Sequence, residues 1–218
     1  MDITHYAEEM KIPFSAICVS RRHTGKSVLI NELVLALVKQ KKVDAVIIFS
    51  NTALINETDY PDFPQAIKHT YSDAKLQKII DHQKSTPKEE RDVVLIIFDD
   101  LLSDAEARRS NLILGAFVEG RHYGVQPLIL SQVGNHILTP TIKNNASYVF
   151  LSRLNRFQLA SIWESLTNID KDEFIGLVEE CNKDYNFVAI DNTSNSNIVE
   201  DWLTIVRVDS SRLKNRTA

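Results

Sequence analysis

The chain has 218 residues, of which 44% are hydrophobic and 25% are charged, and its formal net charge is −4. This length supports one well-buried core but not two large ones. The acidic balance excludes a bulk electrostatic attraction to nucleic acid or anionic membranes, so any DNA contact must be local. We find no apolar run long enough for a membrane segment and no signal-peptide order at the start, and expect a soluble, intracellular protein.

The two cysteines and six histidines show no metal-binding spacing. Cys18 lies in an apolar run and Cys181 in a helical pattern far along the chain, and neither HExxH nor CxxC occurs. We therefore expect two buried thiols and, if a metal is bound, magnesium rather than zinc.

Short apolar runs rich in β-branched residues alternate with longer helical patterns, which is typical of a parallel sheet with crossover helices. Several of the runs, such as AVIIFS and VVLIIF, are continuously apolar, as expected for strands covered on both faces. The sequence therefore predicts an α/β fold with a mostly parallel central sheet. The predicted strands are 14–20, 45–50, 93–98, 127–131, 148–152, 187–191 and 203–208.

Five helices are predicted between these strands, at 26–40, 73–84, 105–122, 156–166 and 171–182. The first is apolar nearly all round and should be buried against the sheet. Asp170 and Glu173 resemble a capping box at the start of the last helix. We divide the chain into an N-terminal extension (1–13), one α/β domain (14–208) and a flexible, mildly basic tail (209–218), with an irregular connection at 51–70.

The segment SRRHTGKS, residues 20–27, follows an apolar strand directly and opens an apolar helix. In a phosphate-binding loop of this kind, backbone N–H groups wrap a phosphate at the positive end of the helix dipole. Lys26 is expected to reach the β- and γ-phosphates of ATP, Ser27 to bind magnesium, and Gly25 to let the phosphate approach the backbone. The predicted nucleotide-binding residues are Arg22, His23, Thr24, Gly25, Lys26 and Ser27.

The first position of the loop departs from the usual GxxxxGK[ST] pattern, because Ser20 stands where glycine is common. The alternative interpretation is a basic turn before a helix, but the flanking strand and helix and a downstream acidic strand favour nucleotide binding. We read the side chains of Arg21, Arg22 and His23 as solvated, with the alternative that one of them reaches the nucleotide or a neighbouring subunit.

Two carboxylates end the predicted strand VVLIIFDD, at the sheet edge where open α/β sheets bind ligands. Asp99 is predicted to hold magnesium through water, and Asp100 to orient or deprotonate the attacking water. The next strand ends LILSQ, so Gln132 should lie at the same edge and contact the γ-phosphate or the water. The alternative for all three is an ordinary polar residue at the end of a strand.

An arginine precedes that next strand, in the segment VEGRHYG, where Gly124 is a plausible helix stop. Arg121 could simply favour the helix dipole. A sharper hypothesis makes it an arginine finger that reaches the ATP of an adjacent subunit. Arg153 and Arg156, after the fifth strand, are competing candidates for this role.

Together, HTGKS, IIFDD, GRHYG and LSQ, in this order, resemble the DNA-packaging ATPases of large double-stranded DNA viruses, the poxvirus-type viral branch of the FtsK/HerA translocases. The resemblance covers residues 14–156. It implies a RecA-like P-loop NTPase that uses ATP and Mg²⁺, forms a pentameric or hexameric ring and threads double-stranded DNA into a preformed capsid. It also implies contact with capsid vertex proteins and a location in the virion or at a cytoplasmic assembly site.

Carried across residue by residue, the resemblance assigns Lys26 and Ser27 to the phosphate loop and Asp99 and Asp100 to the acidic pair. It also assigns Gln132 to the sensor and Arg121 to the arginine acting in trans. Ser20 is the departure from the family pattern. For the DNA-contacting pore loop, the candidates are the connection 51–70 and the segment 101–109, which carries Arg108 and Arg109.

Two other functions remain open at the level of sequence. A small-molecule P-loop kinase would have this length, but no arginine-bearing lid is evident, and the acidic pair followed by SQ favours hydrolysis. A module that binds nucleotide without turnover is supported by Ser20 alone. A GTPase is disfavoured because CNKDY does not match the guanine-reading NKxD motif.

Overall fold

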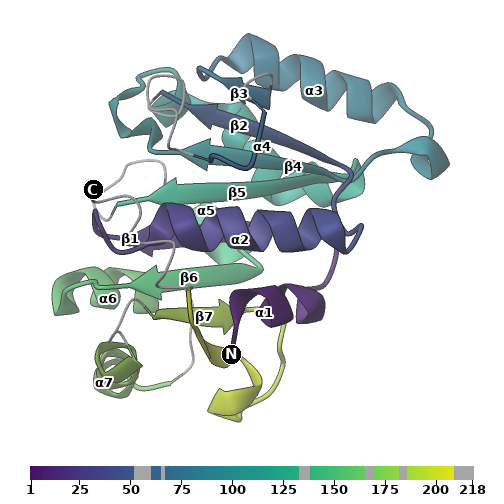
Figure 1. Cartoon of the computed structure of the whole chain (residues 1–218). Coiled ribbons are helices and arrows are strands. Elements are labelled where there is room, and N and C mark those ends of the chain that lie inside the picture. The colour runs from purple at the N-terminus through teal and green to yellow at the C-terminus, as the bar shows by residue number, and fades with distance from the viewer. Residues whose placement is uncertain (52–59, 65–66, 133–137, 165–168, 182–185, 209–218) are drawn as a thin grey trace.

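The computed structural model describes residues 1–51, 60–64, 67–132, 138–164, 169–181 and 186–208. Through these residues runs one sheet in the order β3-β2-β4-β5-β1-β6-β7-β8 (Figure 1). Its strands are β1 (Ala16–Ser20), β2 (Ala45–Ser50), β3 (Lys68–His69), β4 (Val94–Asp99), β5 (Val125–Ser131), β6 (Tyr148–Ser152), β7 (Phe187–Asp191) and β8 (Leu203–Val206).

The sheet is parallel from β3 across to β6, and the last two strands are added antiparallel. The predicted α/β fold with a mostly parallel central sheet is thus confirmed. Because β4, β5 and β1 are adjacent, the segments that follow them meet at one edge of the sheet. This edge holds the predicted phosphate loop, acidic pair and sensor.

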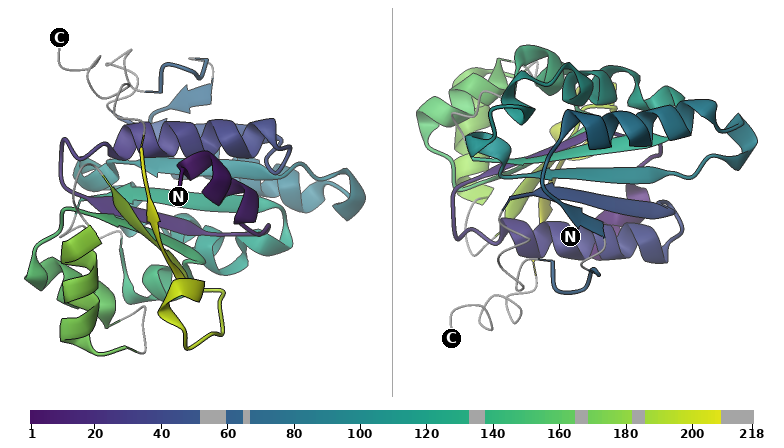
Figure 2. Two further views of the ribbon diagram at one scale, coloured as in Figure 1. Left: turned by 60° about the horizontal axis from the view of Figure 1, so that its bottom comes forward. Right: turned by 90° about the horizontal axis from the view of Figure 1, so that it is seen from above.

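Helices cover both faces of the sheet (Figure 2). One face carries α1 and α2, and the other carries the helices from α3 onward. The helices are α1 (Ile3–Glu9), α2 (Lys26–Lys39), α3 (Asp73–Ser85), α4 (Asn111–Glu119), α5 (Pro140–Asn145), α6 (Arg156–Trp163) and α7 (Lys171–Cys181).

Alternate residues of the central strands are buried in two separate hydrophobic cores, one on each face of the sheet. In β4, Ile96 and Phe98 pack with α3 and α4, whereas Leu95 and Ile97 pack with α2. All four side chains are almost fully buried. The continuous apolar runs in the sequence therefore reflect burial on both faces.

One predicted helix is shorter than expected. The pattern at 105–122 predicts a single helix, but α4 occupies only Asn111–Glu119 and is flanked by 3₁₀ turns at Ala107–Arg109 and Gly120–His122. Ser110 is the reason for the late start, because its hydroxyl accepts from the backbone N–H groups of Leu112 and Ile113 and caps α4.

Three short elements were not predicted, and some predicted residues lie outside the described part of the chain. Helices α1 and α5 and the two-residue strand β3 are too short to show a clear hydrophobic period, so no pattern predicts them. In contrast, Asp170 does cap α7, accepting from the N–H groups of Asp172 and Glu173. The tail 209–218, parts of the connection (52–59 and 65–66) and predicted helix residues 165–166 and 182 lie outside the described residues.

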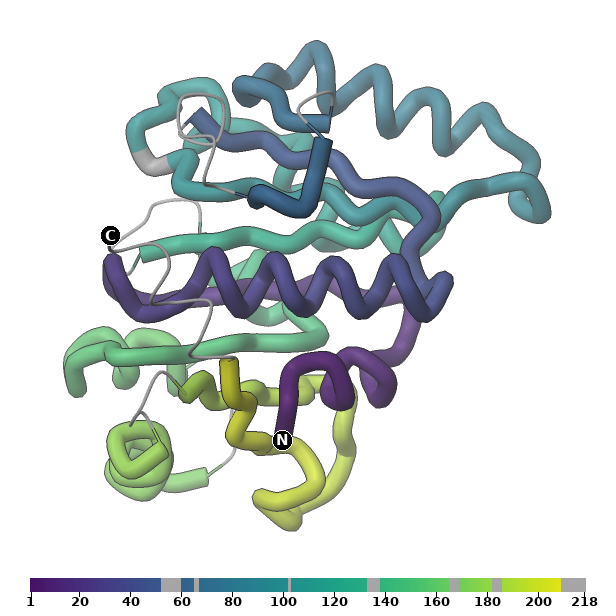
Figure 3. Tube along the Cα trace, in the orientation of Figure 1, coloured from purple at the N-terminus to yellow at the C-terminus, as the bar shows by residue number. Residues whose placement is uncertain are grey.

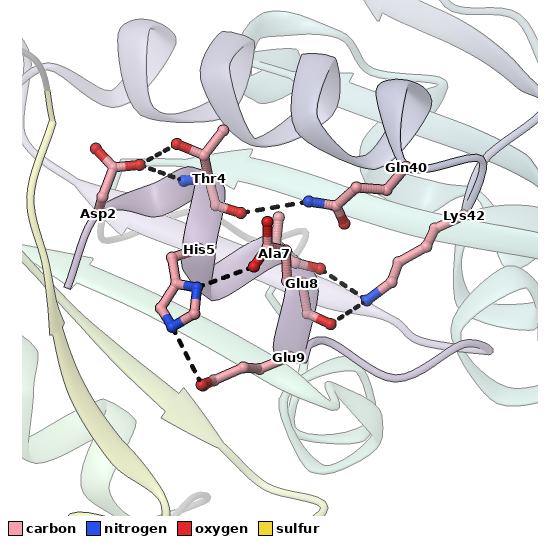
Figure 4. A network of polar contacts seen from close by, with 8 residues as sticks. All are labelled: Asp2, Thr4, His5, Ala7, Glu8, Glu9, Gln40 and Lys42. Atoms are coloured by element: carbon pink, nitrogen blue, oxygen red, sulfur yellow. Dashed lines mark hydrogen bonds and ion pairs between the residues drawn. The ribbon is translucent and has the colours of Figure 1, made fainter.

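The predicted N-terminal extension packs on the domain. Its helix α1 lies against α2, and the first residues run beside the end of β8 (Figure 3), where the Arg207 N–H donates to the Met1 carbonyl at 2.9 Å. Lys42 closes the last turn of α1, since its Nζ donates to the carbonyls of Ala7 and Glu8 at 2.9 and 2.5 Å (Figure 4). A cation at the C-terminal end of a helix also favours the helix dipole.

Candidate active site

Five neighbouring parallel strands end in buried polar side chains at one edge of the sheet. Ser50 ends β2, Asp99 ends β4, Ser131 ends β5, Ser20 ends β1 and Ser152 ends β6, and none is more than 6% exposed. The register places Ser50 opposite Asp99 and Ser20 opposite Ser152. Buried polar groups at the carboxyl ends of parallel strands are typical of a ligand-binding edge.

The predicted phosphate loop joins the end of β1 to the start of α2. It turns through two left-handed residues, His23 at φ 57° and Gly25 at φ 89°. Thr24 is buried, and its hydroxyl donates to the Arg21 carbonyl at 2.8 Å, which closes the loop on itself. Such a turn directs backbone N–H groups inward and creates a concave site for an anion.

Lys26 and Ser27 are the first two residues of α2, and both are half-buried at its N-terminal end. The side chains of Arg21, Arg22 and His23 are exposed, as predicted for solvated loop residues. The N-terminal N–H groups of α2 have no partners within the helix, so they can bind a phosphate together with the lysine ammonium group.

Ser20, the departure from the usual loop pattern, lies inside the protein. It is 0% exposed, and its hydroxyl has no hydrogen-bond partner among the described residues. The side chain therefore lies beneath the loop rather than on its outer surface. A buried hydroxyl without a partner is costly, and a bound water or ligand oxygen would relieve that cost.

The acidic pair follows β4, which the single strand β5 separates from β1 and its phosphate loop. Asp99 is 6% exposed at the end of β4. Asp100 is half-buried and takes a left-handed conformation at φ 49°, which turns the chain sharply into the 3₁₀ turn Leu101–Ser103. Gln132 is also half-buried and follows β5, where the Ser131 hydroxyl donates to its carbonyl at 2.9 Å.

Tyr60 is a site residue that the sequence did not reveal. It is fully buried at φ 55°, and its hydroxyl donates to Asp99 Oδ2 at 2.9 Å. Two residues on, Asp62 accepts from Asn31 of α2 at 2.6 Å, so the segment is tied to the helix that follows the phosphate loop. The surrounding sequence YPDFP has no periodic pattern, and the contact with Asp99 spans 39 residues.

The predicted arginines lie at opposite ends of the parallel strands, two at the carboxyl ends and one at the amino ends. Arg153 and Arg156 follow β6 at the same edge as the phosphate loop, and Arg156 pairs with Asp172 at 3.4 Å. Arg121 lies in the turn before β5, at the opposite edge. All three are exposed. The structure thus brings together the loop, Asp99, Asp100 and Gln132, and places Arg121 away from them.

The two cysteines differ in their surroundings. Cys18 is fully buried in β1, and burial raises the pKa of its thiol to about 12. Nearby Lys26 lowers that pKa and Asp99 raises it, so both charges lie within electrostatic reach of the strand. The prediction of a buried thiol is confirmed for Cys18 but wrong for Cys181, which is half-buried in the last turn of α7.

Residues 4–198 match the family model described as "Poxvirus A32 protein". The chain belongs to the Poxvirus A32 protein family. Membership of this family confirms the resemblance found in the sequence, and with the confirmed fold it identifies the chain as a P-loop ATPase. No curated protein matches this A32-family chain.

Solved structures with the same fold include a viral packaging enzyme and a secretion enzyme. The genome packaging NTPase B204 from Sulfolobus turreted icosahedral virus 2, in complex with AMPPCP, is 19% identical with a TM-score of 0.64, and the match covers 91% of this chain and 100% of that one. The cytoplasmic domain of the type VII secretion ATPase EccC from Thermomonospora curvata is 16% identical with a TM-score of 0.54 over 89% of this chain and 25% of that chain. Among the described residues of the A32-family chain, no helix is long and apolar enough to cross a membrane.

Proposed function

We propose that this A32-family ATPase uses magnesium and ATP to translocate double-stranded DNA into a viral capsid. The observation that carries the proposal is the meeting of the phosphate loop, Asp99, Asp100 and Gln132 at one edge of the sheet, with Arg121 at the opposite edge. The first set provides a hydrolytic site. The position of Arg121 suits an arginine that contacts the nucleotide bound to a neighbouring subunit.

The residues that would bind the nucleotide are contiguous in the loop and helix. The backbone from Arg22 to Gly25 would hold the β-phosphate, and the Lys26 ammonium group would contact the β- and γ-phosphates. These contacts neutralise charge that builds up on the phosphates during hydrolysis. One structure of B204, a protein of this fold, holds the nucleotide analogue AMPPCP.

The oxygen ligands at this edge fit magnesium. The hydroxyl of Ser27 and the carboxylate of Asp99 would hold it, the latter through water, and phosphate oxygens and water would complete the shell. Bound there, the ion would neutralise the β- and γ-phosphate oxygens. The Ser20 hydroxyl, which has no hydrogen-bond partner within the described part of the chain, lies at the same edge and can hydrogen-bond to water of the ion's shell.

The water that attacks the γ-phosphate would be oriented from the same edge. Asp100, turned out of the strand at φ 49°, is half-buried and can accept a proton from that water. Gln132 can hydrogen-bond to the water or the γ-phosphate. The left-handed backbone of Asp100 is a strained conformation of the kind that clusters at active sites.

The assembly expected for this function is a ring of five or six copies. A heterologous interface joins two different faces of the subunit and closes into a ring when its rotation permits. Exposed Arg108 and Arg109, in the segment after Asp100, remain candidates for contact with the DNA backbone. Capsid vertex proteins are the proposed docking partners, and the virion or a cytoplasmic assembly site is the proposed location.

The direct test measures steady-state ATPase activity with and without linear duplex DNA. We expect DNA to stimulate the rate in the wild type and to have no effect in Lys26→Ala, which cannot hold the β- and γ-phosphates. Single-stranded DNA serves as the matched control for polyanion binding. ATP hydrolysis that does not respond to duplex DNA would contradict translocation, and phosphate transfer to a small acceptor instead of water would favour a kinase.

Tyr60→Phe is expected to weaken the response to magnesium. The Tyr60 hydroxyl holds Asp99 Oδ2, and losing a partner that orients a metal-side carboxylate typically costs about 10-fold in metal affinity. We therefore expect the Mg²⁺ concentration for half-maximal nucleotide binding to rise about 10-fold. Tyr6→Phe is the matched control, because Tyr6 is buried on α1 and its hydroxyl has no hydrogen-bond partner among the described residues. An unchanged midpoint in Tyr60→Phe would show that Tyr60 has no such role.

A further inference from the structure

The turn that carries Arg121 is held by side chains from α3. Gln83, which is 2% exposed, donates from Nε2 to the carbonyl of Asp92 at 2.7 Å and to that of Tyr123 at 3.1 Å. The Lys84 ammonium group lies 4.9 Å from the centre of the Tyr123 ring. A buried amide that donates to two backbone carbonyls favours the arrangement in which both stay beside it, because a buried donor without an acceptor is costly.

Arg91, from the connection between α3 and β4, holds the same turn from another side. Its Nη1 donates to the His122 carbonyl at 2.9 Å and its Nε to the Thr86 carbonyl at 2.8 Å, with a longer contact from Nη2 to the Lys84 carbonyl at 3.5 Å. One planar guanidinium group therefore joins the end of α3 to the residue after Arg121. Lysine at this position could not bind all three carbonyls, since its single ammonium group lacks the planar set of N–H donors of a guanidinium group.

The other end of α3 is anchored as well. Ser110 and Tyr71 both donate to Asp73 Oδ1 at 2.5 Å, and the backbone N–H of Asp73 donates to Glu106 Oε1 at 2.8 Å. These contacts tie the start of α3 to the segment after Asp100. Gln83 therefore extends from a helix whose first turn is anchored, and the Arg91 guanidinium group, from the connection after α3, joins the other end of that helix to the Arg121 turn.

The Arg121 side chain is exposed, and its Nε lies 3.5 Å from the ring Nε2 of the adjacent His122. Its direction is therefore set mainly by the backbone of the turn. We infer that Arg91 and Gln83 are positioning residues for Arg121, holding it in the place from which it reaches the nucleotide of the next subunit. The inference rests on the proposed function, in which Arg121 acts in trans.

The decisive variant is Arg91→Met, assayed with duplex DNA beside Arg121→Ala. A misplacement of about 1 Å can cost about 10²-fold in rate, so we expect kcat to fall about 10- to 100-fold. The KM for ATP should change less than about two-fold, because the subunit's own phosphate loop is untouched. Adding Lys26→Ala subunits, which carry an intact Arg121 turn, should restore hydrolysis.

Two further variants keep the test independent of folding and charge. Lys88→Met removes one exposed positive charge from the same connection and should behave as the wild type. Arg91→Lys keeps the charge and most of the side-chain volume but lacks the planar set of N–H donors, so it should remain slow and be rescued by Lys26→Ala subunits. If circular dichroism shows that Arg91→Met is unfolded, Arg91→Lys alone tests the inference.

The outcomes separate the inference from the function on which it rests. If Arg121→Ala is rescued by Lys26→Ala but the Arg91 variants are not rescued, or are as active as the wild type, the positioning role is wrong and the trans arginine stands. If Arg121→Ala itself is not rescued, the trans role of Arg121 fails and the inference fails with it.

Discussion

An equal mixture of Lys26→Ala and Arg121→Ala subunits is expected to hydrolyse ATP, although each variant alone should be about 10³-fold slower than the wild type. The reason is the placement of the two residues. Lys26 begins α2 at the carboxyl edge of the sheet, whereas Arg121 lies in the turn before β5 at the other edge. Each complete site then needs the loop of one subunit and the arginine of the next.

The size of the recovery is set by random assembly. A working site forms only where a subunit with an intact loop adjoins one with an intact arginine, which gives about a quarter of the sites in an equal mixture of a closed ring. We therefore expect about a quarter of the wild-type rate if the sites act independently. Steady-state ATPase rates across a series of mixing ratios would measure this recovered fraction of the wild-type rate.

Arg153 and Arg156 provide the matched controls. Both follow β6 at the edge that also holds the phosphate loop, so they are placed near the subunit's own nucleotide. If either is the required arginine and acts within its own subunit, its alanine variant will be slow, and Lys26→Ala subunits will not rescue it. A mixture of Lys26→Ala and Arg121→Ala that stays inactive would contradict the trans role of Arg121.

The polar ends of the strands could be predicted because an apolar run stops at them. The run VVLIIF ends at Asp99, LIL ends at Ser131 and Gln132, and the strand before the loop ends at Ser20. In a parallel sheet all of these ends meet at one edge, so local sequence was sufficient to place the candidate site.

The contacts of Tyr60 and Arg91 could not be predicted in this way. The Tyr60 hydroxyl reaches Asp99 across 39 residues, and Arg91 reaches the His122 carbonyl across 31. Neither residue belongs to a periodic pattern, and both contacts depend on how strands far apart in the chain are paired. Only the folded sheet brings β2, β4 and β5 together.

The error at 105–122 has a local physical cause. Serine is a weak signal in the middle of a helical pattern, yet the Ser110 hydroxyl accepts from two N–H groups and starts α4 there. The residues before it form the separate turn Ala107–Arg109. An apolar period alone could not separate these two elements, because the cap competes with a continuous helix.

Gly124→Ala is expected to destabilise the protein by about 2–4 kcal/mol, the largest stability effect we predict for a single methyl group. Gly124 has φ 78°, which disfavours any residue with a Cβ atom. The new methyl carbon would also lie 2.7 Å from the Asp92 carbonyl oxygen and 3.0 Å from Gln83 Nε2. The backbone cannot move away freely, because the Gly124 carbonyl accepts from the Val94 N–H at 2.8 Å.

Gly176→Ala is the matched control, since Gly176 is exposed within α7 and a Cβ there meets nothing within 4 Å. Alanine at that position should stabilise the helix by about 0.5–1 kcal/mol. Urea unfolding of both variants, compared through their midpoints at constant slope, measures the difference. Since Gly124 ends the turn that carries Arg121, the residual folded Gly124→Ala protein should also lose DNA-stimulated ATPase activity. A stability equal to that of the wild type would mean that the turn relaxes around the methyl group, and that its tight packing does not hold Arg121 in place.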